Sequence, residues 1–425
     1  MEIIENLKLK EKLYIEKLEN GLTVMIIPKK NIRKKYIMWG VKFGSNDNHF
    51  INVENNNEIK IPDGVAHFLE HKMFEQKNGV NSLDKLSSIG VDANAYTTNN
   101  YTTYLYETTD NFYEALDEFM DYVQNPYYTD ENVEKEKGII AQEIKMYDDH
   151  PSWKVYMNAM KCLYSRCPAR IDIAGSVESI QKITKEILYS CYNTFYRPEN
   201  MLMVVCGDFN PDNLLDEIKK RLIEKPIMPN IKRIYQKEPN KINEKEKIEI
   251  MDVNNPLFVI GIKDFIIENK QELVKRHIAI EILLYMLLGI SSKLYKKLYN
   301  EGLLMAQPEL DYEFVNEYAH ITISGQSKNP HKVNQMLITE IENLKKNGID
   351  KNTFLRIKKK IYGDYVSEYD DISLIAGMFM SDFFKGINSF DYIEQHKQVS
   401  LEYTQKILNE IFVENNMILS IVKGK

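Results

Sequence analysis

The sequence predicts an α+β protein made of two halves that share one order of elements. The chain has 425 residues, too many for one ordinary hydrophobic core, and 44% of them are apolar. Segments rich in β-branched and aromatic residues alternate with segments of helical periodicity, and the order strands, helices, strands, helices occurs twice. Between the repeats, residues 225–247 contain prolines and many charges without an apolar period, as linkers do. We therefore expect a first domain over residues 1–230, a linker over 231–247 and a second domain over 248–425.

The first half opens with strands and continues mainly with helices. Its strand candidates are bounded by Gly, Pro or Asn, and the turn-forming pair Asn99-Asn100 separates two of them. Apolar residues between Phe112 and Val123 recur at three- and four-residue intervals, which gives one helix an apolar stripe. The expected strands are 21–29, 36–45, 91–98, 101–108 and 201–209, and the other expected helices are 64–75, 129–147 and one that ends near residue 224.

The second half repeats this order in outline. Two expected strands, 247–253 and 257–265, precede expected helices at 271–289 and 291–304, and a strand at 318–325 and further helices follow. Where the first half has VAHFLEHKMFE, the corresponding helix of the second half reads IAIEILLYMLL. If the halves are repeats, only the first carries polar side chains suited to chemistry in this helix.

Composition and charge exclude several classes of function. The formal net charge is −7 and no long basic stripe opposes it, so we expect no nucleic-acid partner. The N-terminal 21 residues alternate charged with apolar side chains and lack the apolar run of a signal peptide or membrane span. The cysteines form no CxxC pair, which favours reduced thiols in the cytoplasm. They are Cys162, Cys167, Cys191 and Cys206.

The segment HFLEH at residues 67–71 is the strongest chemical signal. On a helix, His67 and His71 lie one turn apart on the same face, so both imidazoles can reach one metal ion. A catalytic zinc site keeps three protein ligands and a water, and a nearby carboxylate that does not bind the metal can take the proton of that water. Glu70 is placed for this role. The alternative is a solvated helix face that carries two histidines and a glutamate.

HxxEH is the inverted zincin motif, and its flanks GVAHFLEH and KMFE resemble the metal helix of the insulinase (pitrilysin, M16) family of zinc peptidases. The segment ENVEKEKGIIAQEIKMYDD at 131–149 resembles the second metal-site helix of that family. The resemblance implies that Glu143, 72 residues after His71, is the third ligand of one Zn²⁺ per chain. It also implies that Glu136 orients one of the metal ligands without binding the metal itself. Spacing permits Glu143 but does not select it.

The resemblance extends over nearly the whole chain. LENGLTVMIIP, VKFGS and residues 171–186 and 196–209 are similar to family segments, as is LLGISSKLYKKLYNEGLL in the second half. It implies two homologous half-domains, each a mainly antiparallel sheet covered by helices, as in insulinase and mitochondrial processing peptidase. The length resembles subfamily B members that pair two chains, as homo- or heterodimers, into a clam-shell. The sequence around HFLEHKMFE most resembles that of small bacterial members associated with elongation factor P modification or ribosomal-peptide maturation.

The resemblance also implies where a peptide substrate would bind. In the family an edge strand of the first half pairs with an extended peptide, and the alternative here is a plain strand without a ligand. The family uses an arginine and a tyrosine of the second half to position the substrate. Here that half has only Arg276 and Arg356, in helix-like stretches, so we expect a partner subunit to supply such residues. The matching edge-strand residues are Ala93, Asn94, Ala95, Tyr96 and Thr97.

These observations together predict a cytoplasmic zinc-dependent endopeptidase that hydrolyses peptides, with Glu70 activating water on zinc held by His67, His71 and Glu143. The alternative is a non-catalytic insulinase-like scaffold subunit of a peptide-maturation or modification complex. Degenerate subunits usually lose a ligand or the base, and this chain keeps all of them, which favours catalysis.

Overall fold

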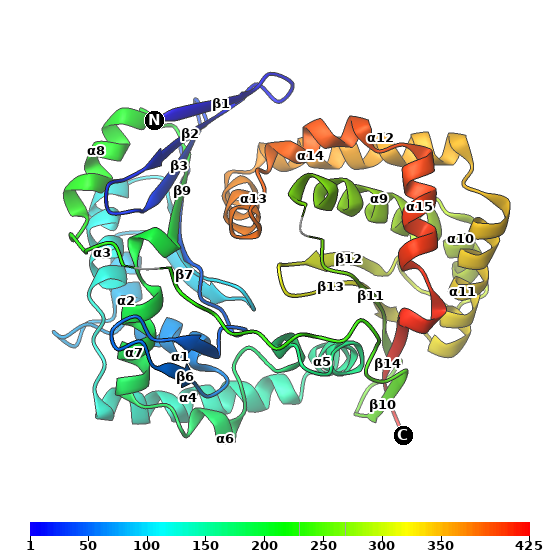
Figure 1. Cartoon of the computed structure of the whole chain (residues 1–425), viewed down its shortest axis with the longest axis horizontal. Helices are drawn as coiled ribbons and strands as arrows, with labels where there is room; N and C mark the ends of the chain where they lie inside the picture. The colour runs from blue at the N-terminus through cyan, green and yellow to red at the C-terminus, as the bar shows by residue number, and fades with distance from the viewer. Residues whose placement is uncertain (229, 268) are drawn as a thin grey trace. The chain divides into compact units, whose positions relative to one another are not determined.

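The computed structural model describes residues 1–228, 230–267 and 269–425, and the chain forms two compact units (Figure 1). The expected domains, 1–230 and 248–425, are each continuous in the sequence. The two units are not, because each half of the chain contributes a segment to the unit of the other half. Unit 1 consists of Met1–Ile144, Asp172–Ile234 and Glu368–Phe384. Unit 2 consists of Lys145–Ile171, Tyr235–Ser367 and Lys385–Lys425.

Unit 1 is built on a seven-stranded sheet with the order β1-β2-β3-β9-β4-β8-β7. All neighbours are antiparallel except β3 and β9, which confirms the expected α+β class with a mainly antiparallel sheet. The strands β1 and β2 were not expected, because charged residues interrupt their apolar pattern. The strands are β1 (Glu2–Asn6), β2 (Glu11–Lys17), β3 (Thr23–Pro28), β4 (Lys35–Val41), β7 (Asp92–Thr97), β8 (Thr102–Thr108) and β9 (Met201–Gly207), and β5 (His49–Ile51) pairs separately with β6 (Glu58–Lys60).

Helices of the first half cover one face of this sheet (Figure 1). Trp39 of β4 and Phe119 of the expected apolar stripe meet in the core between them, with ring centroids 6.2 Å apart. Burial of such aromatic side chains is a main source of stability in a domain of this kind. The helices are α1 (Val65–Lys72), α2 (Ser82–Ser88), α3 (Phe112–Gln124), α4 (Asp130–Asp148), α6 (Val177–Ile180), α7 (Lys185–Phe195) and α8 (Pro211–Arg221).

A helix from the C-terminal part of the sequence, α13 (Ile372–Lys385), covers the other face. Side chains of a strand alternate between faces, so Met38 and Gly40 of β4 point away from the core that holds Trp39. A Cβ atom at Gly40 would lie 2.3 Å from Sδ of Met380 and 2.9 Å from the Phe384 ring. The missing side chain at Gly40 therefore lets α13 approach the sheet closely.

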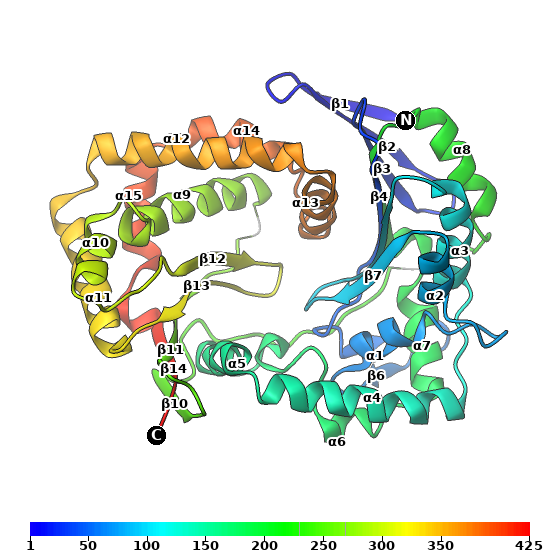
Figure 2. The same ribbon diagram turned by 180° about the vertical axis from the view of Figure 1, so that it is seen from behind.

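Unit 2 is built on a five-stranded sheet with the order β10-β14-β11-β13-β12. Helix α5 (Pro151–Leu163), from the first half of the sequence, lies beside β11 and β14 and shares a core cluster with them (Figure 2). The strands are β10 (Glu246–Ile250), β11 (Leu257–Asp264), β12 (Glu309–Phe314), β13 (Ala319–Gln326) and β14 (Met417–Lys423). The other helices are α9 (Lys270–Leu288), α10 (Lys293–Asn300), α11 (Pro330–Asn347), α12 (Lys351–Ser367), α14 (Phe390–Gln395) and α15 (Leu401–Ile411).

Residues 270–300 form a helical region long and apolar enough to cross a membrane by composition alone. Within its most apolar stretch, 67% of the residues are buried in the fold. A core helix of a globular protein has the same properties, and α9 packs against α12, α14 and α15 of unit 2.

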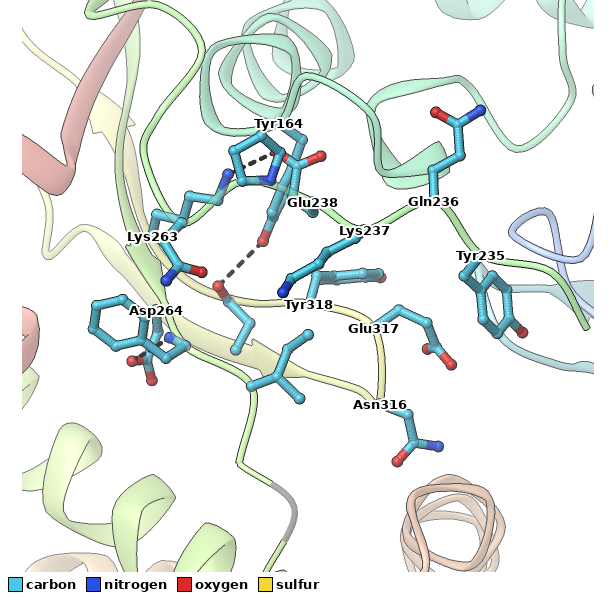
Figure 3. Close-up of a pocket in the computed structure, with 15 residues that line it drawn as sticks. Tyr164, Tyr235, Gln236, Lys237, Glu238, Lys263, Asp264, Asn316, Glu317 and Tyr318 are labelled. Atoms are coloured by element: carbon cyan, nitrogen blue, oxygen red, sulfur yellow. Dashed lines mark hydrogen bonds and ion pairs between the residues drawn. The ribbon is translucent and has the colours of Figure 1, made fainter.

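The expected linker over 231–247 is bound to unit 2 for most of its length. Glu238 accepts hydrogen bonds from the backbone amides of residues 165–167 and pairs with Lys263 at 2.8 Å (Figure 3). Lys263 also donates to the carbonyls of Leu163 and Lys241. The charge of Glu238, one of those that make this segment look solvated in the sequence, therefore attaches it to unit 2.

Candidate metal centre

Helix α1 brings the two histidines of HFLEH together. Gly64 precedes the helix with φ of 95°, and a Cβ there would lie 2.4 Å from the carbonyl oxygen of Ala174, so the position requires glycine. Phe68 and Leu69 are fully buried in the core and fix the orientation of the helix. The rings of His67 and His71 then project from one face, with centroids 4.5 Å apart.

Helix α4 brings Glu143 to the same point. Its Oε1 lies 3.7 Å from Nε2 of His67, and its Oε2 lies 3.7 Å from Nε2 of His71. The three donor atoms lie within 4.8 Å of one another. Catalytic zinc sites use three such protein ligands, with nitrogen or oxygen donors, and leave a further position to water. The donor set of two imidazole nitrogens and one carboxylate thus fits zinc.

Glu136, two turns before Glu143 on α4, contacts Nδ1 of His71, the ring nitrogen that does not face Glu143. Its Oε1 lies 3.1 Å from Nδ1 of His71, and its Oε2 accepts from Nζ of Lys72 at 3.3 Å. Lys72 has no exposed surface and also pairs with Glu75 at 2.7 Å. Burial raises the pKa of Glu136, but the bonds to His71 and Lys72 outweigh it and lower the pKa overall. When the imidazole of His71 is neutral, an ionised Glu136 keeps its single proton on Nδ1 and leaves Nε2 free to bind a cation.

Sequence reasoning missed Lys72. The available signal was its position directly after a candidate ligand, on the apolar side of the helix. A lysine with no exposed surface requires anionic partners, and Glu75 and Glu136 are those partners here.

Glu70 stands beside this cluster and is tied to the substrate-strand candidate. Glu70 is 6% exposed, and its Oε2 accepts a hydrogen bond of 2.6 Å from Oγ1 of Thr97 on β7. Burial raises the pKa of Glu70, while the bond from Thr97 lowers it in part. Thr102, opposite Thr97, donates its own proton to the carbonyl of Phe43, so the proton of Thr97 is left for Glu70.

The protonation of His67 suits the binding of a cation. Burial, and then the neighbouring His71, lower the pKa of His67 to about 3, so its imidazole is neutral at physiological pH. Its Nδ1 is buried and has no hydrogen-bond partner among the residues that the structure describes. Burial also lowers the pKa of His71, but the bond to Glu136 and the nearby carboxylates outweigh it and raise the pKa overall. Burial raises the pKa of Glu143.

The five residues expected to bind the substrate, Ala93 to Thr97, all lie in β7 at the edge of the sheet in unit 1. Their exposure alternates along the strand, and the side chain of Tyr96 is 37% exposed. The ring of Tyr96 packs edge-on against Tyr101 at 6.1 Å. An edge strand with a solvent-facing side has the geometry needed to pair with an extended peptide.

The two arginines of the second half are engaged within unit 2. Arg276 makes two hydrogen bonds to Asp264, of 2.6 and 2.9 Å, and Tyr312 donates to the same carboxylate at 2.7 Å. Arg356 is exposed and donates to Oγ of Ser291. Arg276 therefore has a structural role as an ion-pair partner in the core of unit 2.

Comparisons with known proteins agree with this architecture. Residues 51–175 match the family model described as insulinase (peptidase family M16), and residues 182–361 match the model described as the peptidase M16 inactive domain. The chain is 37% identical to the uncharacterized zinc protease YmfH of Bacillus subtilis, over 99% of both chains.

Among solved structures, an M16-like peptidase from Alicyclobacillus acidocaldarius matches with a TM-score of 0.93 and 32% identity, over 98% of this chain and 99% of that one. The periplasmic protease PqqL of Escherichia coli matches with a TM-score of 0.76 and 16% identity, over 99% of this chain but 48% of its own. The latter likeness concerns the fold alone.

Proposed function

The chain belongs to the insulinase family, peptidase family M16, and we propose that it is a zinc-dependent endopeptidase whose metal is held by His67, His71 and Glu143. The observation that carries this proposal is the convergence of these three side chains from two helices, with the donor atoms of each histidine and Glu143 3.7 Å apart. A buried carboxylate, Glu70, stands next to them without belonging to the ligand cluster.

Zinc bound at this site would acidify a water molecule and polarise the carbonyl of the scissile peptide. Glu70 takes the proton of the attacking water and later delivers it to the leaving amine. Because Thr97 holds Oε2 of Glu70, the proton is carried on Oε1. Glu136 keeps the ring of His71 in one orientation and one tautomer.

The proposed substrate is a peptide bound in an extended conformation along β7. Backbone groups on the outer side of an edge strand can pair with any extended chain, whatever its side chains. Thr97 lies on this strand and bonds to Glu70, so a peptide paired with β7 would pass close to the base. The exposed side chains of the strand would then contribute to specificity.

The test is Glu70→Gln, a substitution that keeps the shape of the side chain and removes its basicity. We expect the variant to retain about one zinc per chain by elemental analysis and to lose about 100- to 10,000-fold in peptide hydrolysis, the usual contribution of a general base. Glu131→Gln, at an exposed position of α4, is the matched control and should change neither quantity. The proposal would be refuted by a correctly folded wild-type chain that does not bind zinc, or by a fully active Glu70→Gln variant.

A second candidate is a non-catalytic scaffold subunit, favoured by the match of residues 182–361 to a domain described as inactive. The zinc analysis together with the Glu70→Gln assay distinguishes the two, because a scaffold has no peptidase activity for that substitution to remove. We also propose that the enzyme works as a dimer with a second copy or a related chain. Support comes from PqqL, in which this chain spans 48% of the length, and from the engagement of Arg276 within unit 2. Full peptidase activity that does not depend on concentration, in the isolated chain, would rule out the pairing.

We further propose a cytoplasmic location. The four cysteines are free and buried, which is the usual state in a reducing compartment.

A further inference from the structure

One face of β12 in unit 2 carries an acidic side chain at every second position. Glu309, Asp311 and Glu313 point to the same side, because side chains of a strand alternate between faces. Among the residues that the structure describes, no cation lies within ion-pair distance of Glu309 or Asp311. Burial and the charge of Glu313 raise the pKa of Asp311, which shows that these carboxylates repel one another. We call these three residues the acidic stripe.

A buried histidine points into the acidic stripe, and one of its ring nitrogens has no hydrogen-bond partner among the described residues. His320 of β13 lies opposite Glu313 in the strand register and is 1% exposed. Nδ1 of His320 lies 2.9 Å from the hydroxyl of Tyr164, which also donates to the carbonyl of Ala319 at 3.1 Å. Burial lowers the pKa of the His320 ring, which keeps it neutral.

Nε2 of His320 and Oε2 of Glu313 face each other at 3.7 Å, which is longer than a hydrogen bond. Nε2 has no hydrogen-bond partner within the described parts of the chain. A buried polar atom without a partner is unfavourable until a polar group meets it. Because the neighbouring side chains of β12 are carboxylates, a cation with N–H donors suits this site best.

An aromatic cavity of about 470 Å³ adjoins one end of the acidic stripe. Glu309 forms part of its wall, and the rings of Tyr147, Trp153 and Tyr156 form another part, with successive centroids 5.6 and 5.8 Å apart. The charges of Glu313 and Asp311 contribute to a raised pKa at Tyr156, after the larger effect of burial, so the rings and the stripe are neighbours. Aromatic faces beside carboxylates attract ammonium and guanidinium groups.

We propose that this face of unit 2 binds a peptide segment that carries Lys or Arg side chains at alternate positions. In an extended peptide, alternate side chains repeat about every 6.8 Å, which is also the spacing of Glu309, Asp311 and Glu313 along their strand. The charge of Lys385 reaches Asp311, yet three carboxylates against one lysine leave the stripe negative. The inference rests on the proposed function in that it names the class of peptide that the enzyme selects.

A second cavity of unit 2, of about 440 Å³, offers no comparable site (Figure 3). Among its buried charged residues, Lys263 and Glu238 pair with each other and have further partners in the protein, and Asp264 pairs with Arg276. A ligand there would meet charges that are already neutralised.

The test measures binding without hydrolysis, in full-length Glu70→Gln protein. The probes are a fluorescein-labelled peptide of alternating Lys and Thr, and the same peptide with Gln in place of each Lys. The variant is Asp311→Asn with Glu313→Gln, which keeps both shapes and the hydrogen bond that Glu313 accepts from Tyr318. The matched control removes two charges from α11, as Glu340→Gln with Glu342→Gln.

We expect the Lys peptide to bind the parent and the control equally, and to bind the stripe variant about tenfold or more weakly. Its affinity for the parent should also fall as salt is raised. Equal affinity of the Lys peptide for the stripe variant and the parent, or equal affinity of the parent for the Gln peptide and the Lys peptide, would overturn the inference. Because hydrolysis is not measured, this result is independent of whether the wild-type chain proves to be a peptidase.

Discussion

The hydrogen bond from Thr97 to Glu70 can be removed with little change of shape by Thr97→Val. The bond is 2.6 Å long, and its acceptor is the carboxylate of a residue that is 6% exposed. Hydrogen bonds to charged groups contribute about 1.5–3 kcal/mol, so we expect the variant to lose about 2 kcal/mol in the free energy of unfolding of unit 1. Thr97→Ser keeps the hydroxyl and should retain most of this stability.

The chain offers a clean assay because it has two tryptophans, Trp39 in unit 1 and Trp153 in unit 2. In a Trp153→Phe background, urea unfolding of zinc-free protein followed by Trp39 fluorescence reports on unit 1 alone. Thr103→Val is the control, since Thr103 is opposite Tyr96 and so lies on the other face of the sheet from Thr97.

In the zinc-loaded enzyme we expect Thr97→Val to lower kcat about tenfold or more and to leave KM nearly unchanged. The hydroxyl contacts the base rather than the peptide, so its loss disturbs proton transfer more than binding. The reasoning is wrong if Thr97→Val unfolds at the same urea concentration as the parent. It is also wrong if Thr97→Val destabilises the protein equally after Glu70→Leu has removed the acceptor.

Three further changes test other parts of the structure. Glu136→Gln should weaken zinc binding about tenfold or more, measured by competition with a chelator, and unchanged affinity would show that Glu136 does not support the site. Burial, and then the charge of Lys385, lower the pKa of His277 to about 3. As the pH falls below about 6.5, the unfolded chain therefore binds a proton at this residue that the folded chain does not bind. Unfolding free energy should therefore fall by about 2 kcal/mol at pH 5 on account of this residue. His277→Gln should remove that share in urea titrations at pH 7 and pH 5, and an equal acid loss in both proteins would contradict the assignment. Gly40→Val should destabilise unit 1 by about 1–3 kcal/mol in the Trp39 assay, because its Cβ would meet Met380, whereas Gly138→Ala, in open space on α4, should not.

The local part of the metal site could be predicted from sequence because it depends on helix geometry alone. Two side chains four residues apart share a face of any α-helix, so HFLEH places His67 and His71 together wherever the helix lies. Glu143 could be named only through a family resemblance, since a separation of 72 residues places no constraint on distance. Lys72 and Glu136 are 64 positions apart, and Thr97 and Glu70 are 27 positions apart, so no local sequence pattern predicts these two contacts.

Strands show the same division between local pattern and tertiary pairing. The segments that became β3, β4, β7, β8 and β9 have the β-branched and aromatic composition of strands and were expected. The edge strands β1 and β12 were not, because they carry charged residues at several positions. Edge strands tolerate such charges, which protect them from pairing with other chains.

By itself, the sequence determined the class of the fold, the presence of two related halves and the pair of histidines, all of which follow from periodicities of 2 and 3.6 residues. Only the tertiary structure decided which unit each segment joins. Helix α5 packs in unit 2 and α13 in unit 1, because each sheet has a second apolar face that its own half of the chain leaves uncovered. Burial of apolar surface has no direction along the chain, so any helix that fits can cover that face, and sequence order does not reveal which one does.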